Sequence, residues 1–229
     1  AGLIAALHHA GYDWLMPDTK ICGLTDPASL DAALDAGAHW VGFVHFPKSP
    51  RHLTLEAAAA LAARARGRAE TVVVVVDPDD ALLAAIKAVV RPDWVQAHGH
   101  ESPARMRQIA RAGRLGVIKA LPIGDAADLA SIQAFAAADL LLLDAKPPKG
   151  AVLPGGNGAA FDWGLLAGRR LPRPWLLSGG LTAETLPTAL RQSGAQAVDV
   201  SSGVETAPGV KSPALIRAFL AAASAPIRT

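Results

Sequence analysis

Short runs of apolar, often β-branched residues alternate along the chain with alanine- and leucine-rich segments at helical spacing. Each apolar run carries few polar side chains, which is typical of strands buried on both faces of a sheet. Eight such units can be counted. The predicted strands are Lys20–Gly23, Trp40–Val44, Thr71–Val76, Trp94–Ala97, Gly116–Ala120, Leu140–Leu143, Trp175–Leu177 and Ala197–Val200.

The regular alternation predicts parallel strands joined by crossover helices. A doubly wound open sheet would give similar local signals. The count of eight units in 229 residues favours closure, so we predict a (β/α)8 TIM barrel with a parallel eight-stranded closed sheet. The barrel domain is expected over residues 18–229, after an N-terminal arm over residues 1–17 that is helical or disordered.

Polar caps, prolines and glycines divide these segments into helices. Asp26, Ser102 and Ser212 each stand directly before a proline, a pattern that predicts a helix start. Gly37 and Gly194 follow apolar helical stretches, where a left-handed residue can end a helix.

Composition and charge narrow the class of protein. Hydrophobic residues make up 51% of the chain, but glycine, proline or charge interrupts every apolar run, so no membrane span is expected. The 22 basic and 20 acidic residues leave a net charge of +2, which gives no reason to expect nucleic acid as a partner. A single cysteine suits the reducing cytoplasm. No targeting signal is expected at the start of the sequence.

Two reactive side chains end predicted strands, where active sites form in barrels of this kind. Cys22 ends the first strand beside Gly23, and Asp144 closes the apolar run of the sixth. A thiol with an ordinary pKa of about 8.5 needs modest help to act as a base. The two groups could serve as base and acid on either side of a ligand. Alternatively, Cys22 is a packing residue and Asp144 pairs with Lys146.

Two glycine-rich turns follow the last two predicted strands. They are Ser178-Gly179-Gly180-Leu181-Thr182 and Ser201-Ser202-Gly203. Both expose backbone N–H groups without obstruction from side chains, which suits a phosphate group. Because barrels often bind phosphate after these two strands, the turns favour a small phosphorylated substrate.

Other polar residues at strand ends are less specific. Gln96 and His98 share one face of the fourth strand, but the histidines are scattered in a way that predicts no metal site. Arg51 is either a solvated surface charge or a clamp for a carboxylate. The long connection Lys146–Ala160 is a candidate lid. Its glycines are Gly155, Gly156 and Gly158.

At these positions the chain resembles the phosphoribosylanthranilate isomerase family of tryptophan biosynthesis, from about Lys20 to Ala222. Several ordered segments carry the resemblance. They are Lys20-Ile21-Cys22-Gly23, Val41-Gly42-Phe43-Val44, Phe46-Pro47-Lys48-Ser49-Pro50-Arg51, Val95-Gln96-Ala97-His98-Gly99, Leu142-Leu143-Asp144-Ala145-Lys146, Phe161-Asp162-Trp163, Leu177-Ser178-Gly179-Gly180-Leu181 and Asp199-Val200-Ser201-Ser202-Gly203-Val204-Glu205.

The resemblance implies a cofactor-free Amadori rearrangement with Cys22 as general base and Asp144 as general acid. It also implies Arg51 at the anthranilate end of the substrate and Asp199 at the sugar hydroxyls. Further implied contacts are Gln96 and His98 to substrate and Gly179, Gly180, Ser202 and Gly203 to phosphate. The Gly155–Gly158 stretch corresponds to the loop over the ligand.

Two other functions stay open at this point. Another phosphosugar barrel enzyme would keep the phosphate turns, but its relatives use Lys and Glu or two Asp residues and would not require Cys22. A catalytically silent barrel that serves as a scaffold would make Cys22 a packing residue. In each case the expected partners are small molecules, with no nucleic acid or membrane, and the chain is expected to be a monomer or a homodimer.

Overall fold

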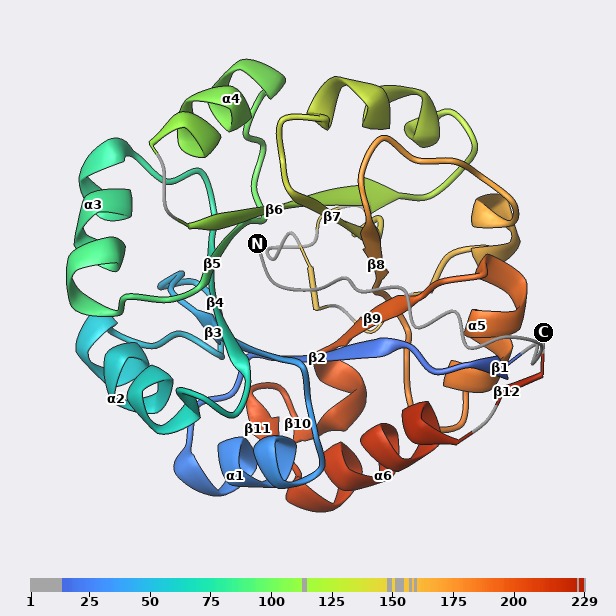
Figure 1. Ribbon diagram of the computed structural model, residues 1–229, viewed down its shortest axis with the longest axis horizontal. Helices are drawn as coiled ribbons and strands as arrows, with labels where there is room; N and C mark the ends of the chain where they lie inside the picture. The colour runs from blue at the N-terminus through green and yellow to red at the C-terminus, as the bar shows by residue number, and fades with distance from the viewer. Residues whose placement is uncertain are drawn as a thin grey trace.

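The computed structural model describes residues 14–112, 115–147, 150, 155–156, 158, 160–225 and 227–228. Eight parallel strands close into a barrel in chain order, as predicted, with helices around the outside (Figure 1). The strands are β2 (Asp18–Cys22), β3 (Trp40–Val44), β4 (Glu70–Val75), β5 (Trp94–Ala97), β6 (Gly116–Ile123), β7 (Leu140–Ala145), β8 (Trp175–Leu177) and β9 (Ala197–Val200).

The helices begin where the sequence predicted. The side chains of Asp26, Ser102 and Ser212 each accept a hydrogen bond from the backbone N–H three residues on. Gly194 has φ of 70° and ends its helix in the left-handed conformation. The α-helices are α1 (Pro27–Asp35), α2 (Leu55–Ala65), α3 (Asp80–Val89), α4 (Pro103–Arg111), α5 (Leu186–Ser193) and α6 (Pro213–Ser224).

Two strand connections differ from the regular alternation. After β6 and β7 the chain forms 3₁₀ helices instead of α-helices, namely η1 (Asp128–Phe135) and η2 (Trp163–Leu166). The residue before η1, Ala127, offers no capping side chain, and η2 spans four residues. Because the first segment lacks a capping side chain and the second is short, an α-helix would gain little stability in either place.

Short elements outside the barrel were not predicted. β10 (Glu205–Ala207) and β11 (Val210–Lys211) form an antiparallel hairpin after η3 (Ser202–Val204). β1 (Trp14–Leu15) pairs antiparallel with β12 (Ile227–Arg228), so segments near the two ends of the chain lie side by side (Figure 1). Residues 1–13 of the predicted arm lie outside the described residues, and the boundary between arm and barrel stays a prediction.

The barrel strands alternate between an inner and an outer apolar layer, as strand geometry requires. The outer layer includes Ile21, Val73 and Leu143 and packs against the helices, whereas Val72, Ile118 and Leu142 fill the interior. Burying each of these side chains contributes about 1.5–3 kcal/mol. Among the described residues, no helix is long and apolar enough to cross a membrane.

Candidate active site

A pocket opens at the carboxyl ends of the barrel strands, and most of the predicted site residues line it. Gln96 does not, because it is fully buried behind the lining. The predicted residues in the lining are Cys22, Arg51, His98, Asp144, Gly155, Gly156, Gly158, Gly179, Gly180, Asp199, Ser202 and Gly203. The fold therefore brings together residues spread over more than 180 positions of the sequence.

The strand order sets the arrangement around the mouth. Asp144 is the second-last residue of β7 and Cys22 ends β2, and the two strands between them in the closed sheet are β8 and β9. The turns that follow β8 and β9 carry Gly179 and Gly203, which both line the pocket. The two reactive side chains thus flank the two glycine-rich turns.

Cys22 lies in a charged environment at the end of β2. It is 7% exposed, and Lys20, two residues earlier on the same strand face, is fully buried. Lys20 Nζ donates to Asp199 Oδ1 at 2.8 Å, and Ser178 Oγ lies 3.4 Å from the other oxygen of Asp199. Burial raises the pKa of the Cys22 thiol, opposed by the cations Lys20 and Lys211, and the net effect is a raised pKa.

Two glycines leave room for this cluster. A Cβ on Gly42 would stand 3.1 Å from Cys22 Sγ and 3.3 Å from Lys20 Nζ, so both atoms lie close to one point. A Cβ on Gly23 would lie 2.6 Å from Cδ of Arg51, and Gly23 has φ of 78°. Larger residues at these positions would displace the thiol, the ammonium or the guanidinium group.

Asp144 contacts a backbone N–H group and a histidine ring. Its Oδ1 accepts from the backbone N–H of Ala145 at 2.9 Å, and its Oδ2 lies 3.4 Å from His98 Nε2. Gln96 Nε2 lies 2.8 Å from His98 Nδ1. Lys146 does not pair with Asp144, because its Nζ binds Asp128 Oδ1 at 2.9 Å. The alternative in which Lys146 neutralises Asp144 is therefore wrong.

Because an amide nitrogen donates, His98 Nδ1 must accept from Gln96 when Nε2 of the amide faces it. A neutral His98 ring then carries its proton on Nε2, the atom that faces Asp144. Gln96 is thus placed to fix the tautomer of His98. Its Oε1 is buried and has no hydrogen-bond partner among the described residues, and a direct contact with substrate stays a prediction.

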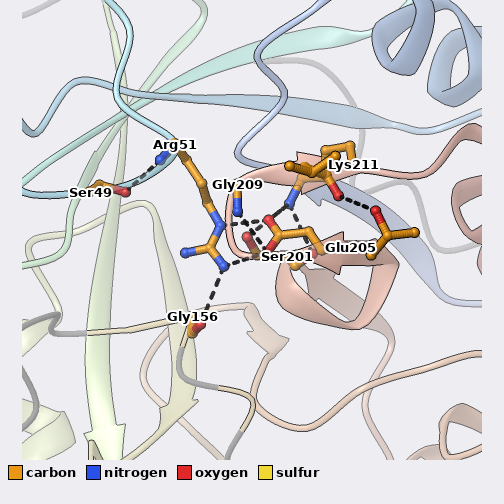
Figure 2. Close-up of polar contacts among 9 residues, drawn as sticks. Ser49, Arg51, Gly156, Ser201, Glu205, Gly209 and Lys211 are labelled. Atoms are coloured by element: carbon orange, nitrogen blue, oxygen red, sulfur yellow. Dashed lines mark hydrogen bonds and ion pairs between the residues drawn. The ribbon is translucent and has the colours of Figure 1, made fainter.

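Arg51 belongs to a buried ion cluster at the rim of the pocket (Figure 2). Its Nε and Nη2 donate to the two carboxylate oxygens of Glu205 at 2.7 and 2.8 Å, and Lys211 Nζ donates to the same carboxylate at 2.5 Å. Arg51 is 5% exposed, which excludes a solvated surface charge. Its Nη2 also lies 3.4 Å from the carbonyl oxygen of Gly156 in the predicted lid.

The charges of this cluster perturb one another. Burial alone would raise the pKa of Glu205, but Arg51 and Lys211 together hold it below its ordinary value. Burial lowers the pKa of Lys211, although Glu205 opposes the effect. Glu205 is therefore ionised at neutral pH and binds Arg51 through a bidentate contact.

Both glycine-rich turns need glycine, the first for its backbone conformation and the second for space. Gly179 and Gly180 have φ of 90° and 68°, in the left-handed region. A Cβ on Gly179 would approach the backbone nitrogen of Ala145 to 2.7 Å, and one on Gly203 would collide with the carbonyl of Leu181. Glycine at these positions lets a ligand approach the backbone closely.

Three charged residues of the site received no role from the sequence: Lys20, Glu205 and Lys211. Lys20 is detectable in principle, because it is a charge inside an otherwise apolar strand and shares a face with Cys22. Glu205 and Lys211 lie on the hairpin, whose fold over Arg51 no local pattern indicates. Among the described residues, no group of His, Cys, Asp and Glu is arranged to hold a metal ion.

Comparison with known proteins agrees with this geometry. A model of the N-(5'-phosphoribosyl)anthranilate isomerase family matches residues 19–222. The isomerase of Paracoccus denitrificans is 56% identical over 209 residues, which cover 91% of this chain and 97% of the relative. The crystal structure of the Thermotoga maritima isomerase is 33% identical and covers 91% of this chain and 98% of its own, with a TM-score of 0.82.

A second solved relative contains a ligand. It is described as phosphoribosyl anthranilate isomerase in complex with reduced 1-(o-carboxyphenylamino)-1-deoxyribulose 5-phosphate. It is 32% identical to this chain, covers 91% of it and 98% of its own length, and has a TM-score of 0.79.

Proposed function

Because the chain belongs to the N-(5'-phosphoribosyl)anthranilate isomerase family, we propose that Cys22 is the general base and Asp144 the general acid of that isomerisation. The reaction converts N-(5-phosphoribosyl)anthranilate to 1-(2-carboxyphenylamino)-1-deoxyribulose 5-phosphate in tryptophan biosynthesis. One observation carries the proposal: the two groups flank the phosphate-type turns in a single pocket. Neither a scaffold nor an enzyme with a Lys/Glu pair requires this arrangement.

Asp144 acts first in this mechanism. Its carboxylic proton passes to the ring oxygen of the furanose while the C1–O bond breaks, and the nitrogen lone pair forms the Schiff base. His98 Nε2, 3.4 Å from Oδ2, supports the carboxylate that is left. Among the described contacts, no lysine or arginine pairs with Asp144; its neighbours are the backbone N–H of Ala145 and His98 Nε2.

Cys22 completes the rearrangement. Its thiolate removes the proton from C2 of the Schiff base, and the electrons shift to the nitrogen to give an enolamine. The enolamine then tautomerises: the hydroxyl on C2 loses its proton, C1 gains a proton, and the C1=C2 double bond becomes the C2 ketone, so the product has the same atoms as the substrate. Burial makes the thiolate costly, and the raised pKa of Cys22 makes it a stronger base once it has formed.

The rest of the pocket binds the two ends of the substrate. Backbone N–H groups of the turns at Gly179, Gly180, Ser202 and Gly203 are proposed to hold the phosphate. Arg51 is proposed to bind the anthranilate carboxylate through the part of its guanidinium not held by Glu205. Asp199 is proposed to accept hydrogen bonds from the sugar hydroxyls.

The surroundings of the site follow from the same chemistry. The contact between Arg51 and the Gly156 carbonyl supports a lid role for the Gly155–Gly158 stretch, which would exclude water from the Schiff base. Residues 148–149, 151–154, 157 and 159 of the predicted lid lie outside the described residues. A free cysteine as base requires a reducing compartment, so we place the protein in the cytoplasm, acting on a small phosphorylated substrate as a monomer or homodimer.

A fluorescence assay tests the assignment. Freshly prepared N-(5-phosphoribosyl)anthranilate is added to the wild-type chain and to Cys22→Ser, and loss of anthranilate fluorescence is followed. We expect rapid loss with the wild type and a rate lowered by about 10³-fold in the variant, which lacks an effective base. Asp31→Asn, at an exposed ion pair remote from the pocket, is the control. A Cys22→Ser variant as fast as wild type would remove Cys22 from the mechanism.

A further inference from the structure

We propose that Lys20 is the positioning residue that makes Cys22 usable as a base, by holding an ammonium group beside the thiolate in the barrel interior. The proposal rests on the role of Cys22 given above. Lys20 is fully buried, faces the interior with Cys22, and no solvent reaches its Nζ. A lysine in such a place is costly unless anions surround it.

The backbone register explains why Lys20 is held so firmly. Lys20 on β2 stands directly opposite Asp199 on β9, and Cys22 stands opposite Gly42 on β3. Cross-strand neighbours of opposite charge pair readily, which gives the 2.8 Å contact between Lys20 Nζ and Asp199 Oδ1. Since Gly42 has no side chain, the space between Nζ and Sγ stays open.

The charges that face Cys22 do not cancel among themselves. On the side of β2, β9 and the hairpin, three cations stand against two carboxylates, which leaves one positive charge. These five residues are Lys20, Arg51, Lys211, Asp199 and Glu205. From the other side of the pocket, His98 and Asp144 face the thiol. A Cys22 thiolate would neutralise the excess charge on its own side.

Within this cluster Lys20 has the larger effect on the thiol. Burial and Asp199 raise the pKa of Cys22, whereas Lys20 lowers it more than Lys211 does. In return, although burial opposes it, Asp199 and the thiolate raise the pKa of Lys20 above its ordinary value, so Lys20 carries an ammonium group at neutral pH. Lys20 therefore acts through Cys22 and needs no contact with the substrate.

The single cysteine of the chain makes a direct test possible. Thiolate formation is followed by ultraviolet absorbance and by the pH dependence of iodoacetamide alkylation, each corrected with Cys22→Ser. In Lys20→Met we expect the alkylation rate at neutral pH to fall about tenfold, because the thiol pKa rises. Lys20→Arg, which keeps the charge, should restore part of that rate.

Lys119→Met is the matched control. Lys119 is also buried and paired with a carboxylate, Glu101, at 2.6 Å, but it lies on the outer side of β6 against Phe135. Its removal has a similar cost to folding and should leave the titration of Cys22 unchanged. An equal shift in both variants would overturn the proposal, as would a folded Lys20→Met whose thiol titrates like that of wild type.

Asp199→Asn is expected to shift the thiol pKa in the opposite direction to Lys20→Met. It also tests the proposal if Lys20→Met does not fold. Asp199 pairs with Lys20 and itself raises the pKa of Cys22. Its removal should therefore lower the thiol pKa and raise the alkylation rate at neutral pH severalfold. A rate that falls or stays constant contradicts the proposal. Because these titrations use no substrate, a failed shift is separable from a failed isomerase assay.

Discussion

The two sides of the pocket differ in the groups that surround their reactive side chain: charged side chains surround Cys22, whereas no lysine or arginine contacts Asp144 among the described residues. On the side of the proposed base, Cys22 stands beside Lys20 and Asp199, which form a buried ion pair at 2.8 Å. On the side of the acid, Asp144 contacts a backbone N–H and the imidazole of His98. One end of the barrel thus holds a cluster of lysine, arginine and carboxylate side chains on one side of the pocket and an aspartate–histidine–glutamine chain on the other.

The contrast matches the opposite tasks of the two groups. A base must lose its proton before it can act, and nearby cations favour the ionised form. An acid must keep its proton until the substrate takes it, and a lysine at hydrogen-bonding distance would remove it. Lys20 beside the thiol meets the first requirement. Lys146 meets the second because it pairs with Asp128 and not with Asp144.

The largest effect is expected at the acid. Asp144→Asn keeps the shape of the side chain but cannot deliver a proton, so kcat should fall about 10³-fold while substrate binding changes little. Steady-state kinetics and titration of the reduced product analogue measure the two quantities. If turnover persists at the wild-type level, the acid lies elsewhere and the contrast between the two sides loses its chemical meaning.

A smaller effect, on stability, is expected in the ion cluster. Glu205→Gln leaves Arg51 and Lys211 buried without a compensating carboxylate, and should lower the free energy of unfolding by about 3 kcal/mol. Urea denaturation measures it. Asp31→Asn, which breaks an exposed pair with Arg64, should change stability little. A comparable loss in both variants would mean that the cluster is no more stabilising than a surface pair.

The shifted pKa of Glu205 also predicts how the free energy of unfolding changes with pH. Since the pKa of Glu205 is lower in the folded protein than its ordinary 4.5, the unfolded chain binds its proton more tightly. The contribution of ionised Glu205 to the free energy of unfolding is complete at pH values above that ordinary pKa. It is lost as the pH falls through the lower pKa of the folded protein. Acid unfolding curves of wild type and Glu205→Gln should therefore converge at low pH.

The smallest effect is expected at Gln96. Gln96→Leu removes the amide that lies 2.8 Å from His98 Nδ1, so both neutral tautomers of the ring become available. We expect kcat to fall about fivefold with KM nearly constant, because the orientation of Asp144 is disturbed without loss of a substrate contact. A large rise in KM with unchanged kcat would instead indicate direct binding by Gln96.

The barrel itself was predictable from the sequence because its strands are local apolar runs. Trp40–Val44, Trp94–Ala97, Trp175–Leu177 and Ala197–Val200 agree with the structure at both ends. The 3₁₀ helices after β6 and β7 were not predictable, because the apolar spacing there resembles that of an α-helix. η1 lacks a side-chain cap, and η2 is capped by Asp162 but is only four residues long. Hairpin β10–β11 escaped detection because its strands are three and two residues long.

The site was predictable in part for the same reason. Strand ends and glycine turns are local features, so Cys22, Asp144 and the phosphate turns could be placed from the sequence, while their roles needed the family resemblance. The pairing of Arg51 with Glu205 joins residues 154 positions apart. Such a contact depends on the closed fold, and no local pattern of charge predicts it.

The distance along the chain between Lys20 and Asp199 also has a consequence for synthesis. The two residues are 179 positions apart, so an emerging polypeptide carries Lys20 without its carboxylate partner until β9 has left the ribosome. The barrel cannot close around that charge earlier without a large penalty. Ribosome-bound chains that stop before β9 should consequently remain open and sensitive to protease, whereas release of the last strands permits compaction.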